Sequence, residues 1–254
     1  MNRSGLITSA VSLAGALCLW MGFTVLRIAD PKLVASPIAV ANEFSAMLKN
    51  GYVGVPLLNH ILASALRTTI GFSCGLVVAL PVGIAIGYSS VANAILSPFL
   101  AILRPIPVLA CIPLAILWFG IGEFSKVALI ALSSFLYMVV NISAGVKSVP
   151  AELLLAAESL GTSKLQLFIH VVLPYSMPFV LAAVRIGAGI SWAVVVSAEL
   201  IAAQQRLGYI IMDAATFFRI PSVYVGIALI GLIGFTIDRS IVLVERYWIH
   251  WSGK

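Results

Sequence analysis

The chain has 254 residues, of which 61% are hydrophobic and 9% are charged, and its mean hydropathy is +1.12. Soluble globular domains carry about 25% charged residues, so this composition excludes a cytosolic enzyme, a disordered chain and a nucleic-acid-binding module. The net charge of +6 does not indicate a nucleic-acid partner, because the 15 Lys and Arg residues are scattered without a basic run. The remaining class is a polytopic membrane protein surrounded by lipid.

Six apolar stretches are long enough to cross the bilayer core, which takes about 20 helical residues. In chain order they are Leu6–Ile28, Thr68–Tyr88, a segment within Val91–Ile121, Val127–Val146, a segment within Pro178–Ala203, and Val223–Ile241. They predict an all-α polytopic membrane protein with about six transmembrane helices. An even number of spans places the 29–64 and 147–170 loops on opposite sides. The positive-inside rule does not orient the chain, because the two sides carry Lys and Arg almost equally.

The first stretch has two interpretations. Arg3 precedes the apolar run, as in a secretory signal peptide. The run is long for a signal peptide, however, and no small-x-small cleavage site follows it. We therefore interpret Leu6–Ile28 as a retained first span.

Small residues recur at four-residue intervals in the first two spans. In the second span they are Gly71, Gly75, Ala79, Gly83 and Gly87, and in the first span they are Ala10, Ala14, Cys18 and Gly22. Such spacing forms a smooth helix face on which another helix backbone can approach closely. The alternative is that Gly and Ala are simply common in membrane helices. The pattern predicts close packing and says nothing about any substrate.

The third apolar stretch is too long for one straight helix. Pro105 and Pro107 interrupt it, so we expect a broken span there. Arg104 stands immediately before this break. If the part before the break lies at the membrane surface, Arg104 lies at the interface too.

A few charged residues fall within apolar stretches, where each costs about 2.5–3.5 kcal/mol at the bilayer centre. They are Arg104, Arg185, Glu199 and Asp238. One interpretation is that these side chains reach the interface or serve structure. The other is that Arg104, Arg185 and Glu199 line a polar translocation path, in which the two arginines attract an anion.

Known catalytic motifs are absent from the sequence. It contains no GxxxxGK[ST] phosphate loop, HExxH, GxSxG or Cys/His metal pattern. We therefore expect no catalytic residue, no metal site and no cofactor in this chain. Active transport would need energy from an ion gradient or from a partner protein.

The polar connection at 147–170 predicts two short helices joined by a turn. Pro150 suits a helix start, and Glu152 in the first turn favours the helix dipole. Gly161 ends this helix, and Thr162 or Ser163 caps the next one. Because the helix is apolar yet lies outside the bilayer, it must dock on a partner surface.

This segment resembles the EAA loop of binding-protein-dependent ABC transporter permeases, whose pattern is Glu-Ala-Ala, three residues, Gly, nine residues, Ile-x-Leu-Pro. Ala156, Ala157, Gly161, Val171, Leu173 and Pro174 fall in register, whereas Leu155 occupies the Glu position. Shape and apolar contacts would then replace any salt bridge of that Glu. The resemblance implies that 147–174 is a cytoplasmic loop that contacts an ATPase through Leu155, Ala156, Ala157, Glu158, Gly161, Leu173 and Pro174.

Further motifs look like those of permeases for taurine, alkanesulfonates and nitrate. They are Arg104-Pro105-Ile106-Pro107, Ile116–Glu123 with Ser125-Lys126, Ser197–Ala203 and Leu207-Gly208-Tyr209. With the EAA pattern they cover roughly residues 36–250. The resemblance implies a small anion such as taurine, an alkanesulfonate or nitrate as the substrate.

The resemblance implies a single permease domain over 1–254, with the fold of a type I ABC importer, in the cytoplasmic (inner) membrane of a bacterium. Separate ATPase subunits would bind ATP and Mg, a binding protein would deliver the substrate outside, and a second copy of the chain would complete a homodimer. Two alternatives stay open. A gradient-driven secondary carrier would show inverted repeats and midplane charges, and a membrane scaffold would explain the lack of catalytic motifs but not the EAA pattern.

Overall fold

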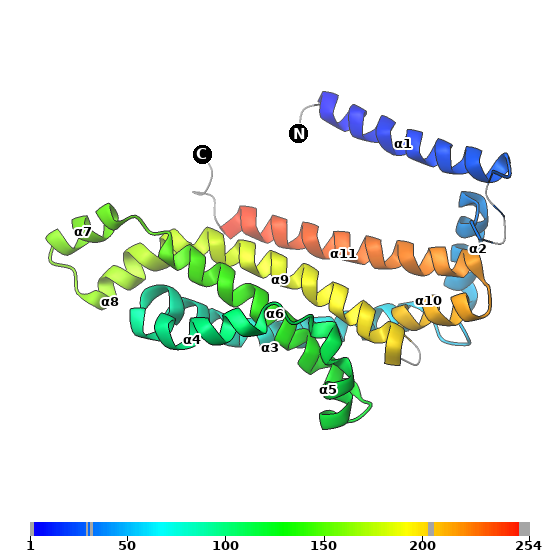
Figure 1. The fold of residues 1–254 in the computed structure, drawn as a ribbon. Coiled ribbons are helices and arrows are strands. Elements are labelled where there is room, and N and C mark those ends of the chain that lie inside the picture. Colours follow the sequence, from blue (N-terminus) through cyan, green and yellow to red (C-terminus); the bar gives the residue numbers. More distant parts are fainter. Residues whose placement is uncertain (1–2, 29, 31–32, 203–205, 249–254) are drawn as a thin grey trace. The chain divides into compact units, whose positions relative to one another are not determined.

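The computed structural model describes residues 3–28, 30, 33–202 and 206–248, and these form an all-α structure (Figure 1). The helices are α1 (Arg3–Val25), α2 (Pro37–Asn50), α3 (Leu57–Tyr88), α4 (Ser90–Leu103), α5 (Ile112–Phe119), α6 (Glu123–Lys147), α7 (Ala151–Ser159), α8 (Lys164–Leu167), α9 (Leu173–Ala202), α10 (Leu207–Thr216) and α11 (Ile220–Trp248). A 3₁₀ turn, η1 (Val108–Cys111), precedes α5, and a π-helical turn, η2 (Phe168–Val172), precedes α9. The predicted all-α class is confirmed.

Four helical stretches are long and apolar enough to cross a membrane: Leu57–Tyr88, Glu123–Lys147, Lys164–Leu200 and Ile220–Glu245. A fifth candidate is the pair formed by α4 and the η1–α5 segment, which meet at a bend of 81°. This bend confirms the broken third span that the two prolines predict. The first expected span forms α1, but its apolar part among the described residues, Ala10–Val25, is shorter than the other spans.

Two spanning helices begin earlier than the hydropathy pattern indicates. Helix α3 starts at Leu57 rather than Thr68, because the charge of Arg67 is paired with Glu123 and does not end the apolar helix. Helix α9 starts at Leu173, and Pro178 lies inside it rather than at its beginning. Hydropathy therefore locates these spans but misplaces their starts.

The small-residue face of α3 packs directly on α6. A Cβ atom added at Gly71 would lie 2.6 Å from Cβ of Ile130, and one added at Gly83 would lie 2.8 Å from Cβ of Ile142. Gly75 and Gly87 meet Ser134 and Val146 in the same way, and Ala79 is fully buried. The predicted close approach is confirmed, and it brings the α6 backbone against α3.

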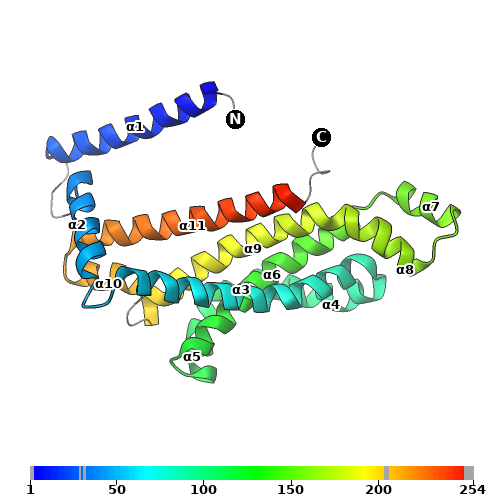
Figure 2. The same cartoon turned by 180° about the vertical axis from the view of Figure 1, so that it is seen from behind.

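The chain divides into two compact units, residues 64–198 with 233–254 and residues 1–63 with 199–232. In the first unit, α6 and α9 lie side by side, and α7 and α8 extend beyond one end of them in both views (Figures 1 and 2). Its core contains Ala79, Leu136, Met138, Ile142 and Ala183. The single-domain interpretation of 1–254 stays a prediction.

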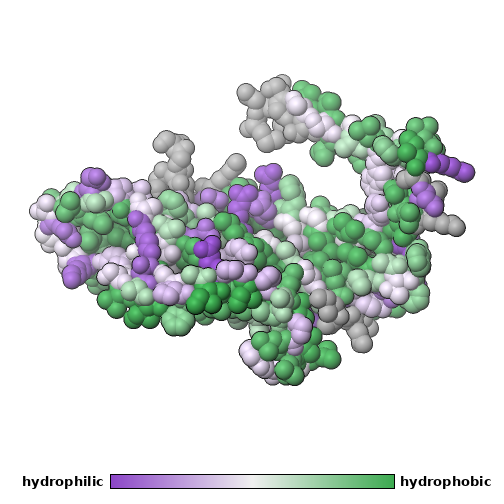
Figure 3. All heavy atoms as spheres, viewed as in Figure 1, coloured by the Kyte–Doolittle hydropathy of each residue, from purple (hydrophilic) through white to green (hydrophobic). Residues whose placement is uncertain are grey.

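Hydrophobic side chains also cover much of the outer surface of the first unit. They gather over α5, where Leu117 and Trp118 are 79% and 67% exposed (Figure 3). In a soluble protein such side chains would be buried, whereas lipid tails are a suitable solvent for them. The exposed apolar surface therefore agrees with a chain that lies in a membrane.

The second unit is tied together by polar contacts among its loops and helices. The Tyr52 hydroxyl donates to Asp213 at 2.6 Å, and Tyr209 donates to the other oxygen of Asp213 at 3.1 Å. Burial, followed by this hydrogen bond, raises the pKa of Tyr52 above its ordinary value. The tyrosine therefore stays protonated and keeps donating throughout the physiological pH range. Ser222 at the start of α11 donates to Glu43 of α2 at 2.6 Å.

Candidate functional site

The 147–174 loop adopts the helix–turn–helix arrangement that its sequence predicts. Pro150 caps α7 without a side-chain hydrogen bond, and Gly161 turns the chain with φ +75°, a conformation that costs other residues about 1 kcal/mol or more. The Ser163 side chain accepts from the Gln166 N–H, and the Gln166 side chain accepts from the Ser163 N–H. This reciprocal capping begins α8. The turn therefore sets the direction of α7 against α8.

The apolar side chains of α7 face two ways. Leu153, Leu155 and Leu160 are 44%, 63% and 85% exposed. Leu154 instead packs against a small cluster formed by Val146, Val149 and Val172. These exposed leucines, here called the apolar edge of α7, lie outside the spanning helices; Leu153 and Leu155 point to different sides of the helix, and Leu160 follows its end. That edge is what a docking surface requires.

The other residues predicted for ATPase contact are not equally accessible. Ala156 and Glu158 are exposed on α7, whereas Ala157 is buried. Gly161 lies in a hollow of about 310 Å³ that Leu160, Thr162, Gln166, His170 and Val171 complete. Leu173 and Pro174 begin α9. The structure therefore brings Leu155, Ala156, Glu158 and Gly161 to the loop surface, and it turns Ala157 inward.

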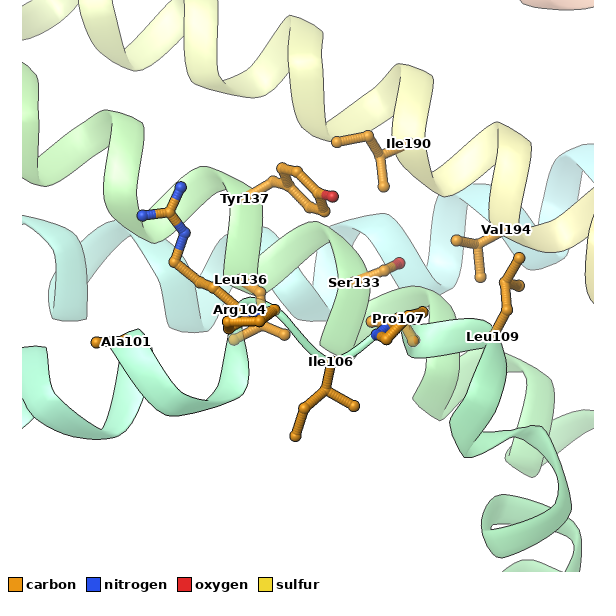
Figure 4. A pocket seen from close by; sticks show the side chains of 12 residues that line it. Ala101, Arg104, Ile106, Pro107, Leu109, Ser133, Leu136, Tyr137, Ile190 and Val194 are labelled. Atoms are coloured by element: carbon orange, nitrogen blue, oxygen red, sulfur yellow. The ribbon is translucent and has the colours of Figure 1, made fainter.

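A cavity of about 700 Å³ opens at the break of the third span (Figure 4). It is lined by Ala101, Arg104, Pro105, Ile106, Pro107, Val108, Leu109, Ser133, Leu136, Tyr137, Ile190 and Val194. These residues come from the end of α4, the break, α6 and α9. Most are apolar, so Arg104 supplies the cationic group of the lining.

Arg104 stands at the carbonyl end of α4. It is the C-cap of that helix, where the helix dipole favours a cation. Its side chain is exposed and lines the cavity, and in Figure 4 Ile190 and Val194 reach toward the same cavity from α9. Tyr137 and Ser133 of α6 add hydroxyl groups to the lining. The cavity therefore combines an apolar wall with a positive charge and hydroxyls, which suits a small anion with an apolar part.

Arg185 has a different environment from Arg104. Its Nε and Nη2 donate to the two carboxylate oxygens of Asp238, at 2.6 and 3.0 Å. The pair joins α9 to α11 beside a separate hollow that also includes Glu245. Because its charge is balanced, Arg185 adds less positive potential than an unpaired arginine. This geometry favours the structural interpretation of Arg185.

Glu199, near the end of α9, is buried against the start of α10. It is 1% exposed and accepts the N–H of Gly208 at 3.2 Å. Gly208 is the second residue of α10, so the carboxylate satisfies a free backbone donor and faces the positive end of the dipole. A Cβ at Gly208 would lie 2.6 Å from that of Glu199. Glu199 is absent from the lining of the cavity at the break.

Sequence reasoning missed the ion pair between Arg67 and Glu123, just as it missed that between Arg185 and Asp238. The Arg67 guanidinium donates from Nε at 2.9 Å and from Nη2 at 2.7 Å to the Glu123 carboxylate. The side chain of Arg67 is 1% exposed and that of Glu123 is 60% exposed, so the carboxylate reaches down to a buried cation. The available signals were that Arg67 borders an apolar stretch and that Glu123 stands at a helix start. Nothing in their spacing predicted that they would meet.

A family model matches this chain over residues 75–249, and its description is "binding-protein-dependent transport system inner membrane component". The taurine transport system permease protein of Escherichia coli is 36% identical over 96% of this chain and 89% of its own length. A Bacillus subtilis protein named for aliphatic sulfonates transport is 33% identical over 98% of this chain and 88% of its own length. The nitrate import permease protein of Synechocystis is 30% identical over 94% of this chain and 88% of its own length.

Solved structures share the fold. An inward-facing structure of a methionine ABC transporter superposes with a TM-score of 0.66 at 19% identity and covers 75% of this chain and 95% of its own. An amino acid ABC transporter superposes with a TM-score of 0.66 at 20% identity and covers 80% of this chain and 98% of its own. At this level of identity the likeness concerns the fold, and it confirms the predicted importer permease architecture.

Proposed function

Because the chain belongs to the family of binding-protein-dependent transport system inner membrane components, we propose that it forms the membrane path of an ATP-driven importer in the cytoplasmic membrane. Separate ATPase subunits bind ATP and Mg and dock on the 147–174 loop. An extracytoplasmic binding protein delivers the solute. Membership of this family favours the permease over a secondary carrier or a scaffold. The observation that carries the proposal is the exposed apolar edge of α7.

The ATPase contact centres on this edge. Leu155 and Leu160 are exposed apolar side chains of a segment that lies beyond the spanning helices. Water contact with such an edge is unfavourable, at about 25 cal/mol for each Å². Leu155, in the position of the family Glu, fits a partner groove through shape, while Ala156 and Glu158 lie on the neighbouring surface. Ala157, Leu173 and Pro174 position the loop rather than touch the partner first.

The substrate is a small oxyanion. Relatives are named for taurine, aliphatic sulfonates and nitrate, all of which are small molecules or ions with anionic oxygen groups. Arg104 supplies the positive charge at the cavity in the third span, and its planar guanidinium matches two anionic oxygens at once. The mostly apolar lining leaves room for a short carbon chain. Arg185 and Glu199 stabilise the helices around the path.

A second copy of the chain closes this path. The backbone between α4 and η1 is non-helical, and such backbone at membrane depth is tolerated only against protein or water. Arg104 and the prolines line a cavity at this break. A homodimer that covers the open side would keep both the backbone and Arg104 away from lipid. Its path would lie between the two copies.

Leu155→Arg tests the docking. The variant should insert normally but lose co-elution with its partner ATPase, and lose ATP hydrolysis stimulated by the loaded binding protein. Leu48→Arg on α2 is the matched control, since Leu48 is 59% exposed and lies in the loop predicted to face outward. Full co-elution and stimulated hydrolysis with Leu155→Arg would show that this edge does not dock the ATPase.

A further inference from the structure

The 147–174 loop continues directly into a spanning helix through a π-helical turn. Residues Phe168–Val172 form η2, and Lys164–Leu200 form one apolar stretch through it. A π turn adds a residue to the helical turn and shifts the register of everything before it. Such turns are uncommon and occur frequently at functional sites. The loop is therefore an extension of α9 with a register shift at Phe168.

Phe168 contacts the far end of α3. Its ring lies edge-on to that of Tyr88, with centroids 5.2 Å apart and planes at 64°. This is a favoured geometry for an aromatic pair. The Tyr88 hydroxyl also points to the backbone oxygen of Lys164, at 3.4 Å. The long distance makes this a weak hydrogen bond, so the ring contact dominates.

Tyr88 occupies the junction between α3 and α4. It is the last residue of α3, and Ser89 caps α4 by accepting the N–H of Ala92 at 3.3 Å. Helix α4 then runs to Arg104 at the cavity of the third span. A displacement at Tyr88 therefore acts at one end of α4, and the other end of α4 carries Arg104, the residue proposed to bind the solute.

The surrounding contacts hold α4 to the core beyond its start. At Gly87 the backbone of α3 packs against Val146 of α6, so these two helices move as one body. Helix α4 packs on the core through Leu96 in its middle and Leu100 in its second half, and near its start Lys147 of α6 donates to Asn93 at 2.7 Å. Leu154 of α7 reaches the same region through the Val146, Val149 and Val172 cluster. A displacement of α7 would therefore be transmitted to Phe168 and Tyr88.

We propose that Tyr88 is a positioning residue of the transport cycle, which transmits movement of α7 and α8 through Phe168 to the start of α4 and so to the Arg104 cavity. This rests on the proposed importer function. The ring pair makes the link, so the hydroxyl is dispensable. Tyr88 is 45% exposed, so its truncation leaves the main core in place.

The test measures solute transported per ATP hydrolysed, in proteoliposomes that contain the chain, its ATPase and its loaded binding protein. Tyr88→Ala should still co-elute with the ATPase and show stimulated hydrolysis, but its transport per ATP should fall about five-fold, the equivalent of about 1 kcal/mol for an aromatic pair. Phe168→Leu should lower it similarly. Tyr88→Phe should retain the wild-type ratio, as should the control Tyr247→Ala on exposed α11.

A double-variant cycle separates transmission from a general weakening. Tyr88→Ala combined with Phe168→Leu should lower the ratio no further than either change alone, because both remove one contact. An unchanged ratio in Tyr88→Ala, or additive losses in the double variant, would overturn the proposal. Failure of the unmodified chain to co-elute with any ATPase would instead overturn the importer function itself.

Discussion

Helices α1 and α3 carry the same small-residue spacing but use it differently. On α3, a Cβ added at Gly71 or Gly75 would overlap atoms of α6, and Ala79 is fully buried. On α1, Ala14 and Cys18 are exposed, and a Cβ added at Gly22 would meet nothing within 4 Å among the described residues. The spacing therefore permits a close approach but does not create one. A matching face on another helix is needed as well.

Arg104 and Arg185 differ in the same manner. Arg104 lines a cavity, whereas Arg185 is held by both oxygens of Asp238. In both comparisons, the same residue type or spacing has different surroundings in the folded chain. The difference becomes measurable when the same substitution is made at both compared positions.

The largest effect is expected for Gly75→Leu. An added Cβ already overlaps Ser134, and the longer side chain would separate α3 from α6 along the ladder. Overpacking of this kind costs about 1–3 kcal/mol or more, so we expect the yield of folded protein in detergent to drop about ten-fold. Gel filtration measures the yield of folded protein, and thermal unfolding measures its stability. A normally folded Gly75→Leu protein would mean that the α3–α6 contact is looser than the structure has it.

Arg104→Gln should abolish most transport without changing expression. Hydrogen bonds to a charged group contribute about 1.5–3 kcal/mol, so uptake at low solute concentration should fall about ten-fold or more. Arg104→Lys, which keeps the charge, should retain more. Arg185→Gln should leave uptake close to wild type and lower the melting temperature, because it breaks the tie between α9 and α11. Equal loss of uptake in both Gln variants would erase the distinction between the arginines.

Exchange of the paired charges sharpens this distinction. Asp238→Asn should lower the melting temperature, since it leaves Arg185 facing a neutral partner. The double variant Arg185→Asp with Asp238→Arg should recover stability if the pair is structural. Uptake of the double variant near the wild-type value would support that role. Loss of uptake despite recovered stability would place Arg185 on the path.

The smallest effect is expected for Gly22→Leu on α1. The new side chain enters open space in this chain, so folding and yield should match the wild type. Comparison with Gly75→Leu holds the substitution constant and changes only the neighbouring helix. A yield as low as that of Gly75→Leu would reveal that α1 packs through its small face in the assembled transporter.

Much of the loop and of the broken span could be predicted because the signals are local. The turn at Gly161 needs a residue that tolerates positive φ, and Ser163 with Gln166 forms a cap within one helical turn. Pro105 and Pro107 lie two residues apart and remove two nearby backbone donors, which favours a break, whereas the single Pro178 stays inside α9. The inward position of Ala157 was not predictable in this way, since it depends on what lies beneath α7.

Composition and local pattern alone specified a helical membrane protein, the approximate places of its long spans, the break after Arg104 and the helix–turn–helix of the loop. Local sequence signals act over one or two helical turns, so they do not depend on the rest of the fold. Tertiary structure decided that Arg67 pairs with Glu123, that Arg185 pairs with Asp238, and that the small-residue face of α3 contacts α6. The reason is physical: an ion pair or a close helix contact needs two surfaces from distant parts of the chain, and hydropathy and spacing describe each surface separately.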